Sequence, residues 1–113
     1  MNTIESNKLI AEFMGAKLFV NDGAIILYKL NSKTYHIGSM NYDTDYNWLM
    51  PVVEKIEGLG HDVSILKNAV GLQWCGIGKF SSNNTKATGT TKIEAIYSAV
   101  VEFIKWYNKQ NQI

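Results

Sequence analysis

Apolar residues recur at helical spacing in three segments of the chain, residues 6–16, 48–56 and 93–107. The third segment is the clearest, because an apolar stripe lies opposite a face of Glu, Ser and Lys. Residues typical of helix ends flank the first two segments. Ser6 or Asn7 can cap the start of the first helix and Gly15 can end it, and Gly58 and Gly60 can end the second helix. The pattern predicts one helix near the start, one in the middle and one near the end.

Between these helices the pattern changes to the alternation of strands. Residues 16–38 predict a three-stranded meander, with turns at Asn21-Asp22-Gly23 and Asn31-Ser32-Lys33. Residues 61–80 predict two more strands, joined by a hairpin at Asn68 to Gly71. Residues 81–90 are polar and predict a loop. The expected fold is a single α+β domain over residues 1–113, in the order α-βββ-α-ββ-α, with a mostly antiparallel sheet of about five strands packed by helices.

Composition agrees with one globular domain of 113 residues, 46% hydrophobic and 19% charged. No apolar run approaches the roughly 20 residues needed to cross a bilayer, and the first residues do not form a signal peptide. The single cysteine, Cys75, cannot form an internal disulfide. We therefore expect a cytoplasmic protein that does not bind membranes.

The charged residues disfavour nucleic acid as a partner. The net charge is +1, and the chain has eleven lysines and no arginine, the residue that best forks onto phosphates and guanine edges. The lysines are spread singly along the chain. Binding of nucleic acid through the Lys79–Lys92 segment is the least favoured of three functional hypotheses.

Residues 42–51, YDTDYNWLMP, concentrate acids and aromatics before the only proline, Pro51. Asp43, Asp45, Asn47 and Glu54 match four positions of a calcium-binding loop, but Trp48 stands where that loop needs glycine. A helix start explains the same residues better, with Asp43 or Asp45 as its cap. Two helix starts remain open: near Asp43, which places Pro51 inside the helix, or near Trp48, which places it in the first turn.

Aromatic side chains beside this irregular backbone are candidates for ligand contact. Trp48 is expected in the core, whereas Tyr42 and Tyr46 remain open between core and ligand site. The predicted ligand- or partner-binding residues are Tyr42, Asp43, Asp45, Tyr46 and Trp106.

No catalytic constellation is found, and neither a metal site nor a cofactor is expected. His61 and Asp62 are adjacent, so on a strand they would point to opposite faces and could not act together. His36 is expected on the less buried face of its strand, and Cys75 is expected to be a buried structural thiol. Thr91 with Glu94 forms a capping box for the last helix.

Three segments together resemble a group of short, uncharacterised proteins from bacteriophages and prophages of the Bacteroides–Flavobacterium group. The segments are NKLIAEFMG at 7–15, DYNWLMPVVEKIEGLG at 45–60 and TKIEAIYSAVVEFIKWYN at 91–108. The resemblance implies a phage or prophage origin and action inside the host cell. It implies no activity, cofactor or catalytic residue.

The leading functional hypothesis is a small non-enzymatic binding protein in the bacterial cytoplasm. Its partner would be a host or phage protein, or a small anionic metabolite, and the sequence leaves homo-oligomer formation open. The alternative is a hydrolase or nuclease that uses Asp43 and Asp45 with a divalent ion.

Overall fold

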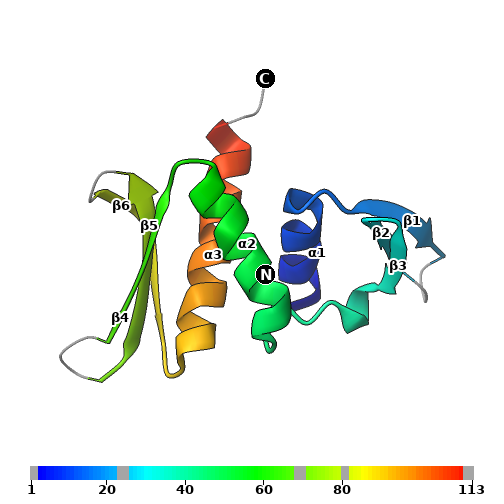
Figure 1. Cartoon of the computed structure of the whole chain (residues 1–113). Coiled ribbons are helices and arrows are strands. Elements are labelled where there is room, and N and C mark those ends of the chain that lie inside the picture. Colours follow the sequence, from blue (N-terminus) through cyan, green and yellow to red (C-terminus); the bar gives the residue numbers. More distant parts are fainter. Residues whose placement is uncertain (1–2, 23–25, 68–70, 80–81, 111–113) are drawn as a thin grey trace.

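Three helices lie between two small antiparallel sheets (Figure 1). The computed structural model describes residues 3–22, 26–67, 71–79 and 82–110, and the molecule measures 46 × 33 × 23 Å. The elements in chain order are α1 (Thr3–Phe13), β1 (Lys17–Asn21), β2 (Ile26–Leu30), β3 (Lys33–His36), a 3₁₀ turn η1 (Ile37–Ser39), α2 (Tyr46–Gly58), β4 (Asp62–Lys67), β5 (Gln73–Lys79), β6 (Ser82–Gly89) and α3 (Lys92–Gln110).

The α+β class, the three helices and the antiparallel pairing agree with the sequence prediction, but the single five-stranded sheet is wrong. The strands form two separate sheets of three, in the orders β1-β2-β3 and β4-β5-β6. The sixth strand is β6, which occupies the segment predicted to be a polar loop. None of the helices in the described ranges is long and apolar enough to cross a bilayer.

The first sheet is a meander with a tight second turn. β2 and β3 pair up to Leu30 opposite Lys33, so Asn31 and Ser32 form a two-residue connection. Both have positive φ, 52° and 70°, as a type I′ turn requires. This confirms the second predicted turn; residue 23 of the first predicted turn lies outside the described residues.

The second sheet packs one face against the helices. In β5, Cys75 and Ile77 are fully buried, and their partners in β4 and β6 are apolar or small. α3 lies against β5 and β6, and α2 lies against β4 (Figure 1). The pairing of β4 with β5 confirms the predicted hairpin, although residues 68–70 of its loop lie outside the described part.

The first two helices are each followed by a glycine that the sequence predicted to end them. Gly15 and Gly60 have φ of 95° and 93°, a conformation that glycine adopts without steric cost. After α2, the Gly60 amide donates to Glu57 and the His61 amide donates to Ile56, which together form a Schellman motif. At the other end of the chain, the predicted capping box of α3 is present, because the Glu94 amide donates to the Thr91 hydroxyl over 3.2 Å.

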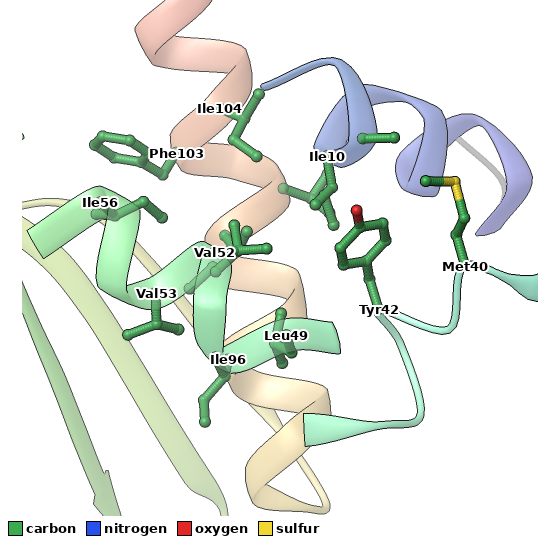
Figure 2. Close-up of a cluster of buried hydrophobic side chains, with 14 of the residues drawn as sticks. Ile10, Met40, Tyr42, Leu49, Val52, Val53, Ile56, Ile96, Phe103 and Ile104 are labelled. Atoms are coloured by element: carbon green, nitrogen blue, oxygen red, sulfur yellow. The ribbon is translucent and has the colours of Figure 1, made fainter. Parts of the chain in front are cut away.

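The largest buried side chains gather where the three helices meet (Figure 2). α1 contributes Ile10, and the loop after η1 contributes Met40 and Tyr42. The remaining members come from α2 and α3: Leu49, Val52, Val53, Ile56, Ile96, Phe103 and Ile104. This cluster holds the loop at residues 40–45 in place, and that loop forms one wall of the candidate site.

Candidate binding pocket

A pocket of about 260 Å³ lies where the first sheet meets α2. Its lining comes from the end of α1, the β2–β3 hairpin, the loop after η1 and the first half of α2. The lining residues are Met14, Leu30, Asn31, Tyr35, Tyr42, Asn47, Trp48 and Pro51. None of them carries a charge, and three are aromatic, so the pocket is suited to an uncharged group about the size of one or two rings.

The three aromatic rings of the pocket pack on one another edge to face. The centroid of the Trp48 ring lies 5.1 Å from that of Tyr35 and 5.3 Å from that of Tyr42, with interplanar angles of 82° and 77°. This is the geometry that the quadrupoles of aromatic rings favour. Because each ring fixes the next, the aromatic wall is preorganised.

Tyr42 is the most unusual residue of this pocket. Its side chain is 1% exposed, yet its hydroxyl has no hydrogen-bond partner among the described residues. Figure 2 shows the ring within the buried cluster and the hydroxyl pointing toward α1. Burial, and second the nearby Tyr35 hydroxyl, raise the pKa of Tyr42 to about 12. The group is therefore a neutral phenol at physiological pH, and it can both donate and accept a hydrogen bond.

The local sequence explains how the first half of α2 forms part of the pocket wall. The helix begins at Tyr46, between the two starts that the sequence left open, and Asp45 is its cap: a carboxylate oxygen accepts the Asn47 amide over 2.8 Å. Pro51 therefore lies inside the helix. Since proline has no N–H, the Asn47 carbonyl lacks the donor that a regular helix would supply four residues later. Both Asn47 and Pro51 line the pocket.

A buried asparagine positions the loop that carries Tyr42. The Asn7 side-chain amide donates to the Met40 carbonyl over 3.0 Å and to an Asp43 carboxylate oxygen over 3.3 Å. Its carbonyl oxygen accepts the Tyr97 hydroxyl over 2.9 Å. The sequence presented Asn7 as a candidate cap, but α1 begins earlier, at Thr3, and Asn7 instead links α1, this loop and α3.

Of the five predicted site residues, only Tyr42 lines the pocket. Asp43 and Asp45 lie on the same loop, but one is bonded to Asn7 and the other caps α2. Tyr46, 42% exposed, is the first residue of α2 and is not among the lining residues. Trp106 belongs to a separate cluster on α3, where its ring centroid lies 5.9 Å from that of His61 and 5.8 Å from that of Phe103.

Sequence reasoning missed most of the lining, because it comes from segments far apart along the chain. Tyr35 and Leu30 read as ordinary strand residues, and Asn31 read only as a turn residue. The one local signal was Pro51, which follows Asn47 and Trp48 by a few residues. It indicated irregular backbone at the start of α2, and this is the side of the pocket that Asn47, Trp48 and Pro51 form.

The residues considered for catalysis occupy structural positions. His61 is buried, with its ring 4.8 Å from that of Phe103, while Asp62 is exposed. Burial raises the pKa of the Cys75 thiol to about 11, so the reactive thiolate is scarce at neutral pH. His36 is exposed, as expected from its strand.

A metal site would need several ligands converging on one point. Within the ranges that the structure describes, no group of three or more His, Cys, Asp or Glu side chains is arranged to hold a metal ion. The carboxylates of Asp43 and Asp45, on which the hydrolase alternative depends, are both engaged as described above.

Comparisons of the chain with protein-family models, with curated proteins and with solved structures find no match.

Proposed function

We propose that this chain is a non-enzymatic binding protein whose pocket receives a small, planar, uncharged group. The observation that carries the proposal is an uncharged pocket with an aromatic wall, to which Tyr42 belongs; its buried hydroxyl has no partner among the described residues. A buried polar group in this state destabilises the free protein. Water does not reach this hydroxyl in the free protein, so a ligand that shifts the Tyr42 ring and hydrogen-bonds to the hydroxyl would remove that penalty.

The rest of the lining supports the same ligand chemistry. A flat ring can pack against Trp48 and Tyr35, whose own rings already pack edge to face. Asn31 and Asn47 supply amide donors and acceptors for the edge of that ring. An anionic metabolite would place only its neutral ring here and keep its charged group outside, since no lining residue is charged.

Two sources offer such a ring: a small metabolite, or an aromatic side chain of a host or phage protein. The resemblance of three segments to short phage proteins supports action in the cytoplasm of a bacterial host. Native mass spectrometry of protein purified gently from bacterial cells separates the two sources. A retained small mass indicates a metabolite, and a species without added mass directs the search to a protein side chain.

The pocket itself can be tested with two matched probes, p-cresol and toluene, which differ by one hydroxyl. In ¹H–¹⁵N spectra we expect both to shift the indole N–H signal of Trp48 and the side-chain amides of Asn31 and Asn47. The signals of Trp74 and Trp106, outside the pocket lining, serve as internal controls.

Affinity should depend on the Tyr42 hydroxyl. p-Cresol should bind the wild-type protein more tightly than toluene, by about two- to tenfold for one net hydrogen bond. In the Tyr42→Phe variant this preference should disappear. If neither probe shifts the pocket signals at millimolar concentration, the proposed function is wrong.

A further inference from the structure

The first sheet has a second face, opposite the pocket, that none of the described helices covers. Along β2, Tyr28 is buried against α1, whereas its neighbour Lys29 is exposed on the other face. Figure 1 shows α1 on one side of this sheet only. We call the uncovered side the outer face; its members are Lys17, Phe19, Val20, Leu27, Lys29, Thr34 and His36.

Within the strands, the outer face carries only positive formal charge. Its charged members are Lys17 and Lys29, since β1, β2 and β3 contain no Asp or Glu and their third lysine, Lys33, pairs with Leu30 on the pocket side. Lys17 and Lys29 are direct cross-strand partners, so two ammonium groups extend from neighbouring positions. Like charges placed directly opposite one another destabilise a sheet. A carboxylate bound between them would turn this repulsion into attraction.

An exposed aromatic lies beside these lysines because of a bulge. The register of β1 with β2 shifts between Leu18 and Val20, which leaves Phe19 as the extra residue. Phe19 is 59% exposed, and the Lys29 ammonium lies 5.9 Å from the centre of its ring. The next cross-strand pair, Val20 with Leu27, is half-buried. Apolar side chains therefore adjoin the two cations on an open surface.

We propose that the outer face docks a segment of a partner protein that combines acidic with apolar side chains. Carboxylates of the partner would pair with Lys17 and Lys29, and its apolar side chains would cover Phe19, Val20 and Leu27. This arrangement has the apolar centre and charged rim of a protein interface. Charge complementarity sets which partners dock and speeds their encounter.

Single-stranded nucleic acid is also anionic, but it fits the face less well. Binding of bases on a sheet uses several exposed rings as stacking platforms, and this face offers one, Phe19. The aliphatic pair Val20 and Leu27 provides contact area that a protein side chain uses and a base does not need. The chain also has no arginine to grip a phosphate backbone.

A selection from a random peptide library on the immobilised protein tests the proposal without a known partner. The wild-type protein should enrich peptides that are rich in Asp or Glu together with Phe, Leu or Ile. A Lys17→Gln, Lys29→Gln double variant should bind the selected peptides about two- to thirtyfold more weakly, as expected for the loss of two exposed ion pairs. A Lys67→Gln variant is the matched control, because Lys67 is an exposed strand lysine of the second sheet.

The location and the class of partner are checked with the same proteins. Amide signals of β1 and β2 should shift when a selected peptide is added, and the affinity should fall as salt is raised. Three results would each overturn the proposal: selected peptides without acidic enrichment, equal affinity of the peptides for the double lysine variant and the Lys67→Gln control, or amide signal shifts confined to the pocket. Binding of an oligothymidylate in place of acidic peptides would assign the face to nucleic acid instead. Because the pocket lies on the other face, the probes p-cresol and toluene test the two proposals separately.

Discussion

Replacing Tyr42 by phenylalanine removes one oxygen atom and leaves every ring contact of the pocket in place. An unpaired buried hydroxyl costs about 1–3 kcal/mol, because it has given up its bonds to water without replacement. The packing of the ring against Trp48 does not depend on that oxygen. We therefore expect Tyr42→Phe to raise the free energy of unfolding by about 1–2 kcal/mol.

Tyr97→Phe is the control, since it deletes a hydroxyl that has a partner. The Tyr97 hydroxyl donates to Asn7 over 2.9 Å, so its loss leaves an acceptor without that bond. This variant should lower the free energy of unfolding by about 1–2 kcal/mol. The same chemical change at two tyrosines thus has opposite predicted signs.

Urea unfolding followed by circular dichroism gives both free energies, and thermal melts provide an independent check. In a domain of this size, 1 kcal/mol corresponds to about 4 °C in Tm. Equal destabilisation by the two variants would refute the reasoning, because it would show that the Tyr42 hydroxyl is bonded, for example to a buried water.

Four further predictions address the rest of the fold. Asn7→Ala should lower the free energy of unfolding by about 2–4 kcal/mol in urea titrations, because the Met40 carbonyl and the Tyr97 hydroxyl both lose their hydrogen bond to Asn7; a change below 1 kcal/mol would contradict its linking role. Gly89→Ala should destabilise, since a Cβ there would lie 2.8 Å from Glu94 Cβ and 2.9 Å from the Ala95 nitrogen, whereas Gly58→Ala in α2, with nothing within 4 Å, should stabilise by about 0.5–1 kcal/mol. Folding raises the pKa of Cys75 from 9.0 to about 11, so the stability that its buried, neutral thiol contributes is fully present below pH 9 and is lost as the pH rises toward 11. Cys75→Ala should reduce this alkaline loss of stability in urea midpoints measured across that range. Millimolar calcium, magnesium or manganese should leave the Tm unchanged, and a clear upward shift would revive the metal-dependent alternative.

The elements with strong periodicity could be predicted from the sequence, and the arrangement of the strands could not. Apolar spacing and flanking glycines located α2 and α3, and turn residues located the meander of β1, β2 and β3. β6 was missed because Thr85, which is buried, and Ala87, which is half-buried, are small and only weakly apolar, so the alternation of a strand was hidden. A strand pattern also does not say which strands pair, and here the helices separate two sheets.

The candidate site shows the same limit. Tyr42 was found because it lies in a local cluster of aromatics and acids. The pocket around it depends on a β2–β3 hairpin and the end of α1, whose contribution becomes visible only after folding. Asp43 and Asp45 illustrate the converse: their local density suggested ligand chemistry, but a cap and a bond to Asn7 account for both.

The hydrogen bond between Asn7 and Tyr97 joins positions 90 residues apart, and this has a consequence for synthesis on the ribosome. α3 follows every other element of the domain, yet it covers β5 and β6 and packs against α1. Until α3 has left the exit tunnel, the apolar faces of α1, α2 and the second sheet lack the helix that packs against all three. The nascent chain therefore folds late, and a product cut short before α3 exposes surface that promotes aggregation.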